Sequence, residues 1–175
     1  MNNKIGLFFG TDTGTTETIT EKIILLLGSD AVQKHDVYDA QVSDFDPYEY
    51  IILGLSTWYD GELQSDWESF FEEFQTIDFT NKKVAIFGVG DQYSYAETFI
   101  DGVGIIGKVV LKNGGALFGK WSTEGYYHDD SEAELEEGLF CGLAIDEDNQ
   151  AEETDERLKK WVSQVLNEFN IAVSA

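Results

Sequence analysis

Two patterns of apolar and polar residues alternate along the chain. Short, almost continuous apolar runs lie at Lys4–Phe9, Tyr50–Leu55 and Lys83–Gly88. Runs of this length and density are typical of strands that are covered by helices on both faces. The segments that follow them repeat apolar residues at helical spacing. The chain therefore predicts successive βαβ units and a parallel sheet.

Two further strands are less regular. One is predicted at His35–Asp39, and the last is split into Ala116–Lys120 and Leu139–Ile145. Residues 121–138, between these halves, are acidic and have no clear period, so we interpret them as a long insertion at one edge of the sheet. Five strands and five helices in 175 residues predict one α/β domain over residues 1–175. The expected architecture is a three-layer, doubly wound, five-stranded parallel sheet of order 2-1-3-4-5 with an interrupted fifth strand.

The helical segments each have one apolar face, which predicts the core. These faces comprise Ile19, Ile23, Leu26 and Leu27; Leu63, Trp67, Phe70, Phe71 and Phe74; Phe99, Val103, Ile106 and Val110; and Leu158, Trp161, Val162, Val165 and Phe169. The one cysteine, Cys141, lies in an apolar run and is predicted to be a buried, unreactive thiol. A single cysteine excludes an internal disulfide and a cysteine-based metal site.

The loop after the first strand has the features of a phosphate site without a basic side chain. It reads TDTGTT, Thr11–Thr16, and a helix follows at once. The unpaired N–H groups of a first helical turn attract an anion, and Gly14 permits close approach of the backbone. Because no Lys follows the glycine, the P-loop fingerprint is absent and triphosphate hydrolysis is disfavoured; the dinucleotide-binding fingerprint is absent as well. Simple capping of the helix by Thr and Asp is the alternative.

The loops after the third and fourth strands carry large aromatic residues beside glycines. They read STWYDGEL, residues 56–63, and GVGDQYSYAETF, residues 88–99. Trp58 and Tyr95 can stack on a planar ligand, whereas packing on neighbouring loops is the alternative for either ring. All three loops are predicted at the carboxyl ends of the strands, where doubly wound sheets bind ligands. They favour a ligand with a phosphate at one end and a planar ring at the other, a mononucleotide such as FMN.

With these motifs the sequence resembles a flavodoxin of the long-chain type. The resemblance runs nearly end to end, through TDTGTT, TWYDGELQSDW, GDQYSYAETF, LAIDEDNQ and the final amphipathic helix. It implies a low-potential one-electron carrier rather than an enzyme. Its non-covalently bound FMN would cycle between semiquinone and hydroquinone while it shuttles electrons between redox proteins. No catalytic residue and no metal site is predicted.

The resemblance also implies which residues bind FMN. The phosphate is assigned to Thr11, Asp12, Thr13, Gly14, Thr15 and Thr16, and the ring is expected between Trp58 and Tyr95. The ribityl chain and ring edge are assigned to Thr57, Gly61, Gly90, Asp91 and Gln92, with Asp146 close to the ribityl end. The Tyr59 and Asp60 backbone is expected to offer a carbonyl to the ring. Ser56 and Thr98 depart from the residues that many relatives have there, Pro and Asn, and neither is assigned as a ligand.

The net charge of the chain indicates which kinds of partner it can bind. The chain has 34 Asp and Glu against 11 Lys and Arg, a formal net charge of −23. Such a chain repels nucleic acid and anionic membranes and favours basic protein faces. Basic-faced redox proteins, such as a ferredoxin–NADP reductase or other low-potential donors and acceptors, are the expected partners. With no signal peptide or membrane span apparent, a cytoplasmic monomer is expected.

Two other functions are open on the same fold. An FMN-dependent reductase of quinones or other small molecules would need an open substrate pocket over the ring. A phosphoacceptor receiver domain would need an Asp at the end of the third strand, but that strand ends in Leu55-Ser56-Thr57. We therefore keep the reductase as the alternative and set the receiver domain aside.

Overall fold

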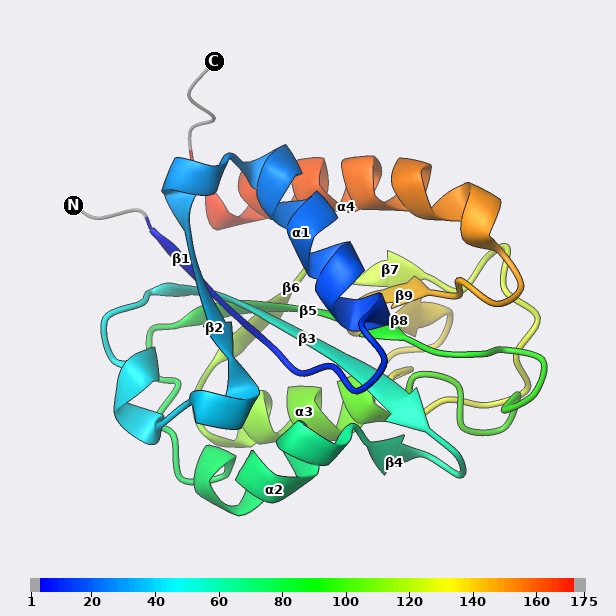
Figure 1. The fold of residues 1–175 in the computed structure, drawn as a ribbon, viewed down its shortest axis with the longest axis horizontal. Helices are drawn as coiled ribbons and strands as arrows, with labels where there is room; N and C mark the ends of the chain where they lie inside the picture. Colours follow the sequence, from blue (N-terminus) through cyan, green and yellow to red (C-terminus); the bar gives the residue numbers. More distant parts are fainter. Residues whose placement is uncertain (1–3, 172–175) are drawn as a thin grey trace.

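The computed structural model describes residues 4–171. Its centre is a parallel sheet in the order β2-β1-β3-β5-β6 (Figure 1). The main strands are β1 (Ile5–Phe9), β2 (Val32–Asp36), β3 (Tyr50–Trp58), β5 (Lys83–Val89) and β6 (Ala116–Phe118). A short strand, β4 (Glu62–Leu63), turns back antiparallel on the end of β3. The predicted doubly wound order is confirmed, with β5 and β6 in the places of the fourth and fifth strands.

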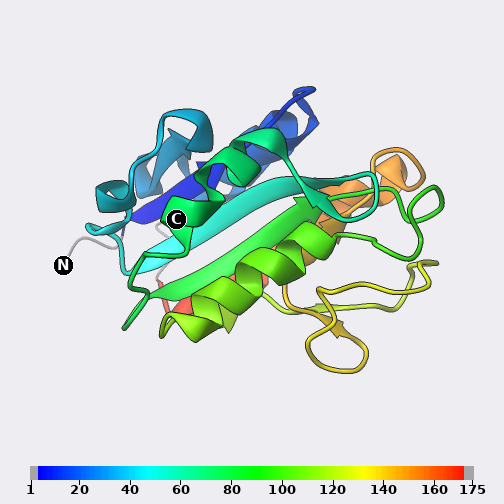
Figure 2. The ribbon, with the colours of Figure 1, turned by 90° about the horizontal axis from the view of Figure 1, so that it is seen from below.

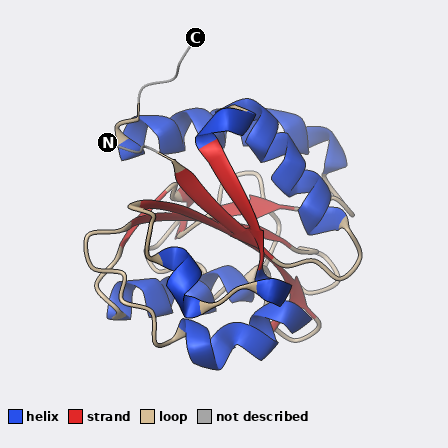
Figure 3. Cartoon of the chain, turned by 60° about the vertical axis from the view of Figure 1, so that its left-hand side comes forward, coloured by secondary structure: helices blue, strands red, loops and turns tan. Residues whose placement is uncertain are grey.

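Helices cover both faces of this sheet and make three layers (Figure 3). On one face lie α1 (Thr15–Leu27) and α4 (Thr154–Phe169), and on the other lie α2 (Ser65–Phe74) and α3 (Asp101–Lys112). Within residues 4–171, no helix has the length and apolar character needed to span a bilayer.

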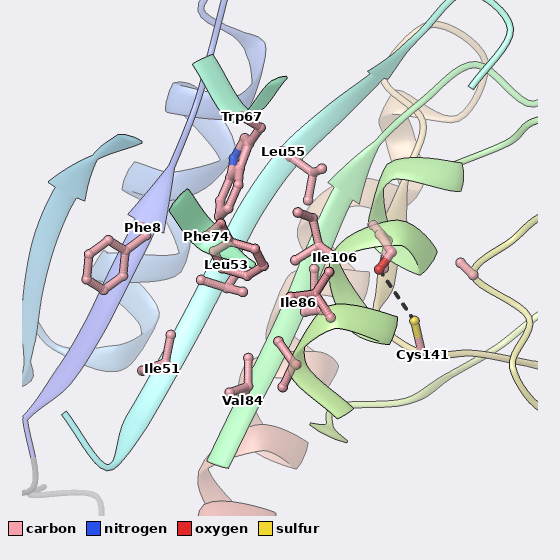
Figure 4. Packing of buried hydrophobic residues seen from close by; sticks show 14 of the residues in the cluster. Phe8, Ile51, Leu53, Leu55, Trp67, Phe74, Val84, Ile86, Ile106 and Cys141 are labelled. Carbon is pink, nitrogen blue, oxygen red and sulfur yellow. Dashed lines mark hydrogen bonds between the residues drawn. The ribbon is translucent and has the colours of Figure 1, made fainter. Parts of the chain in front are cut away.

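Each face of the sheet buries its own apolar cluster. Successive residues of a strand point to opposite faces, so the continuously apolar strands supply both clusters. The cluster under α1 and α4 includes Leu7, Ile52, Phe87 and Trp161. The cluster under α2 and α3 includes Phe8, Leu53, Ile86 and Trp67 (Figure 4). Trp67, Trp161 and Cys141 are buried, as predicted.

The second strand and the segment that follows it differ from the prediction. The pattern places a strand at His35–Asp39, but β2 spans Val32–Asp36. The chain turns immediately after β2 because the Asp36 carboxylate accepts a hydrogen bond from the Tyr38 N–H (3.0 Å) and caps a 3₁₀ helix. Residues 37–39 and 42–45 are 3₁₀ helices, so the described chain contains four α-helices rather than five regular helices.

The predicted interruption of the fifth strand is confirmed, but its second half is shorter. β6 pairs with the beginning of β5, and β9 (Leu143–Ile145) pairs with its end. Leu139–Phe140, predicted as part of the same strand, forms β8 in a separate antiparallel pair with β7 (Trp121–Ser122). Gly142 lies between the two pieces, and a Cβ there would lie 2.3 Å from the Ile86 carbonyl oxygen, so this position requires a glycine.

The insertion, residues 121–138, lies beside α3 (Figure 2). A Cβ on Gly104 of α3 would lie 2.3 Å from the Glu132 carbonyl, so the helix and the insertion approach as closely as a glycine permits. The Asp129 and Asp130 N–H groups both donate to the Ala96 carbonyl, at 2.7 and 3.0 Å. These contacts attach the insertion to the segment that leads from β5 into α3.

Candidate cofactor site

The parallel strands bring three predicted loops to one edge of the sheet. Phe9 pairs with Gly54, and Ser56 pairs with Val89, so the parallel strands β1, β3 and β5 end at the same edge of the sheet, with β3 extending furthest, to Trp58. Their segments can be followed from the ends of these strands in Figure 1. This edge is where doubly wound sheets bind ligands.

The loop after β1 leaves the beginning of α1 open. Gly14 occupies the N-cap position with a φ of 90°, and among the described residues no side chain caps this helix. The Thr11 hydroxyl oxygen accepts a hydrogen bond from the Gly14 N–H (2.9 Å), a contact that fixes the loop and does not use the hydroxyl proton. A Cβ on Gly14 would meet no atom within 4 Å. The open space and the uncapped N–H groups are suited to an anion.

The side chains of this loop differ in their exposure and in their contacts. Thr13 is exposed, whereas Thr16 is buried below the helix start. Asp12 turns toward α2, where its carboxylate accepts hydrogen bonds from the Ser65 hydroxyl (2.5 Å) and from Gln64 Nε2 (2.8 Å). Partial burial raises the pKa of Asp12, but these hydrogen bonds outweigh it and hold that pKa below the usual value. Asp12 thus ties the loop to α2.

The turn between β3 and β4 carries the first aromatic ring. Trp58 pairs with Glu62, and three residues connect them. Tyr59 has a φ of 45° and Gly61 a φ of 90°, so two of the three connecting residues are left-handed. The Trp58 Nε1 atom is buried and has no hydrogen-bond partner among the described residues. A buried indole N–H normally finds an acceptor, which makes this orphaned donor a sign of a ligand.

Residues just before and at the start of α3 fix this turn through hydrogen bonds and close contacts. The Gly102 N–H donates to the Thr57 hydroxyl oxygen (3.0 Å), and the Thr98 hydroxyl donates to the Tyr59 carbonyl (3.3 Å). The Asp101 carboxyl lies against Gly61, where a Cβ would be 2.6 Å from Oδ2. Sequence reasoning missed Asp101, because nothing in its local pattern shows that the end of β3 contacts it.

The loop after β5 is held by a network of buried polar groups. Asp146 is fully buried and accepts hydrogen bonds from the Gln92 N–H (3.1 Å) and from Gln92 Nε2 (2.7 Å). Asn149 Nδ2 donates to the carboxylates of both Asp146 and Asp91, each at 2.8 Å. Partial burial raises the pKa of Asp91, but hydrogen bonds from Ser94, Asn149 and Tyr93 outweigh it and lower that pKa.

This network differs from the sequence assignment in what the side chains contact. The Gln92 and Asp146 side chains are occupied by each other, and the remaining Gln92 oxygen accepts from the Tyr127 N–H (2.6 Å). Gly90 lies next to Phe99, which would be 3.2 Å from a Cβ at that position. Tyr95 remains 36% exposed. Asn149 was missed by sequence reasoning because its role depends on a contact that spans 58 residues.

A separate cavity of about 860 Å³ lies at the opposite, amino ends of the strands. Its lining includes Lys82, whose ammonium group donates to the carbonyls of Phe45 (3.1 Å) and Tyr48 (2.6 Å). The lysine charge is therefore satisfied by the protein backbone. None of the predicted site residues lines this cavity.

Comparison with known protein families identifies the family to which this chain belongs. Residues 7–161 match the family model described as flavodoxin. The chain belongs to the flavodoxin family. It is 50% identical to the flavodoxin of a Nostoc species over 171 residues, which cover 98% of this chain and all of that protein. It is 44% identical to flavodoxin 1 of Escherichia coli over 166 residues, 95% of this chain and 94% of that protein.

A solved flavodoxin has the same overall structure. The crystal structure of Fusobacterium nucleatum flavodoxin bound to flavin mononucleotide superposes with a TM-score of 0.89, at 33% identity, over 94% of this chain and 98% of that one. The long-chain flavodoxin resemblance and electron transfer rather than enzymatic turnover are thereby confirmed. The reductase alternative is not favoured.

Proposed function

We propose that the three loops hold one FMN and that the chain carries single electrons between redox proteins. This proposal rests on the orphaned Trp58 Nε1 and on the uncapped helix start at Gly14, which come at the end of β3 and after the end of β1, neighbouring strands at the same edge of the sheet. Bound FMN supplies one-electron transfer through its flavin ring. The loops supply binding, orientation and the local electrostatic field.

The phosphate is assigned to the Thr11–Thr16 loop. The uncapped N–H groups at the start of α1 and the hydroxyl groups of Thr11, Thr13 and Thr15 are its donors. The helix dipole adds a favourable positive potential at this end of α1. Gly14 is suited to the innermost position because its φ of 90° and the open space beside it let the backbone face the anion.

The flavin ring is assigned to the space between Trp58 and Tyr95. Trp58 stands at the end of β3 with its ring 6.2 Å from that of Tyr59, tilted by 45°. Tyr95 is positioned by its own N–H, which donates to the Asp91 carbonyl (3.0 Å). The backbone of Thr57 and of Tyr59–Gly61, with that of Gly90–Gln92, would line the ring edge.

Three predicted ligands fit a supporting role better than direct contact. The carboxylates of Asp12, Asp91 and Asp146 are each engaged by protein N–H or O–H groups. We infer that they fix the loops and that the neighbouring backbone contacts the cofactor. Such supporting hydrogen bonds keep a binding site preorganised.

Exposed acidic residues surround the proposed site and favour partners with a basic face. Asp60 and Glu62 are exposed on the turn, next to the exposed Tyr59. A ferredoxin–NADP reductase with a basic docking face is a suitable partner class. Electron-transfer complexes of this kind bury a small interface and are short-lived.

An NADPH assay separates a carrier from a reductase. We expect no sustained NADPH oxidation when the FMN-loaded protein is mixed with NADPH and a quinone. Adding a ferredoxin–NADP reductase should start turnover, because an electron carrier takes its electrons from a partner enzyme rather than from NADPH directly. Sustained quinone reduction without the added reductase would support the enzyme and contradict the carrier.

Association with such a reductase should depend strongly on salt. The net charge of −23 should accelerate the encounter in dilute buffer. At physiological ionic strength, charges are screened beyond about 8 Å, so we expect the association rate constant to fall by roughly tenfold or more. Stopped-flow kinetics across a salt series measures this. A rate independent of salt would mean that apolar contacts, such as those of Tyr59, govern docking.

A further inference from the structure

One buried carboxyl group lies between the proposed cofactor turn and the insertion. Asp101, the first residue of α3, is only 6% exposed. Its Oδ1 accepts a hydrogen bond from the Glu132 N–H of the insertion (2.7 Å). Its Oδ2 lies on the other side, where a Cβ on Gly61 would be 2.6 Å away. The two oxygens of a single side chain therefore contact segments that are far apart in sequence.

The charges around Asp101 are mostly of its own sign. The insertion contributes the carboxylates of Glu132 and Asp130. Lys108 of α3 is the nearby cation, and its ammonium group also pairs with Glu132 at 3.4 Å. Burial, with the carboxylates of Glu132 and Asp130, raises the pKa of Asp101, although the Glu132 N–H and Lys108 oppose this.

This environment makes the ionised carboxyl costly to the fold. Because the pKa is higher in the folded state than in the unfolded chain, folding stability falls as the pH rises from about 4 through the raised pKa. The full cost is present once the pH is well above that raised pKa. A charge retained at a cost to stability, beside a binding site, is typical of groups that serve the site.

We propose that Asp101 is a positioning residue that couples the insertion to the cofactor turn, so that its charge acts on both the Glu132 contact and the second reduction step. The inference rests on the proposed FMN site at this turn. The ionised carboxyl holds the Glu132 N–H through a charge-assisted hydrogen bond, which is about twice as strong as a neutral one. It also places a negative charge directly behind Gly61, where it opposes the addition of further negative charge to the ring.

Asp101→Asn tests this role, because the amide keeps an oxygen acceptor for Glu132, removes the charge and places an NH₂ group where the second carboxyl oxygen was. In the FMN-loaded protein at pH 7 we expect the second reduction potential to become less negative by about 59 mV, a tenfold change for one electron. Hydrogen exchange of the Glu132 amide should become several-fold faster. The urea midpoint of the apoprotein should not fall, because the variant relieves a buried charge. Asp129→Asn, an exposed neighbour in the insertion, is the control for the change in net charge.

The outcomes separate this inference from the proposed function. If the wild-type protein does not bind FMN, the proposed function fails. If it binds FMN but Asp101→Asn and Asp129→Asn shift the potential equally, the role of Asp101 is overturned. Should Asp101→Asn not fold, the wild-type Asp101 carboxyl can be titrated by NMR in the oxidised and fully reduced protein. Coupling requires a higher pKa in the reduced protein, by thermodynamic reciprocity. The same pKa in both states would contradict the proposal.

Discussion

Thr11→Val with Thr13→Val is expected to weaken FMN binding by about 10²- to 10⁴-fold. Each substitution removes a hydroxyl that is assigned to the phosphate, and a hydrogen bond to a charged group contributes about 1.5–3 kcal/mol. Riboflavin has the same ring and ribityl chain but no phosphate, so its dissociation constant should hardly change. Fluorescence titrations of the apoprotein with both ligands measure the two constants.

Thr18→Val is the matched control for the phosphate loop. Thr18 lies one turn into α1, and its hydroxyl donates to the Gly14 carbonyl (3.0 Å), so it is not assigned to the phosphate. The same chemical change there should affect FMN and riboflavin alike and only slightly. An equal loss of both ligands in the Thr11 and Thr13 double variant would contradict the phosphate assignment.

Asp60→Asn with Glu62→Gln is expected to make the second reduction potential less negative. The second electron adds negative charge to the ring, and no Lys or Arg lies in any of the three loops to offset it. One carboxylate about 10 Å away opposes that charge by ~0.4 kcal/mol in water and by ~1.7 kcal/mol at an effective dielectric constant of 20. Removing two such charges should therefore shift the potential by roughly 35–140 mV. The first potential should change little, since the first step can take up a proton.

Spectroelectrochemical titration gives both potentials. Glu72→Gln with Glu73→Gln provides a control with the same change in net charge on the exposed surface of α2. If the two double variants shift the second potential equally, net charge alone is responsible. An unchanged second potential in Asp60→Asn with Glu62→Gln would contradict local electrostatic control.

The strands could be predicted where burial on both faces leaves a continuous run of apolar residues. Strands β1, β3 and β5 are covered on both faces, and their apolar runs lie within a few residues of the observed bounds. The edge strand β2 has a single fully buried residue, Val32, so the pattern there is too weak to fix its position. The split of Leu139–Ile145 was not predictable because its two pieces pair with different strands, β7 and β5, which local sequence does not reveal.

The sequence predicts which loops form the candidate site better than it predicts which side chains in those loops contact one another. Glycines, threonines and aromatic residues after buried strands carry a local signal that any parallel sheet would place at one edge. The hydrogen bonds of Asp146 with Gln92 span 54 residues, and the contact of Asp101 with Glu132 spans 31. Long-range pairings of this kind decide whether a carboxylate faces the ligand or supports the loop, and local sequence carries no trace of them.

The visible spectrum of the purified protein shows whether these three loops hold one FMN. We expect a yellow protein with flavin absorbance, one FMN released per chain on denaturation, and uptake of two electrons in separate steps on titration. A colourless protein that takes up no FMN on reconstitution would mean that the loops do not form an FMN site.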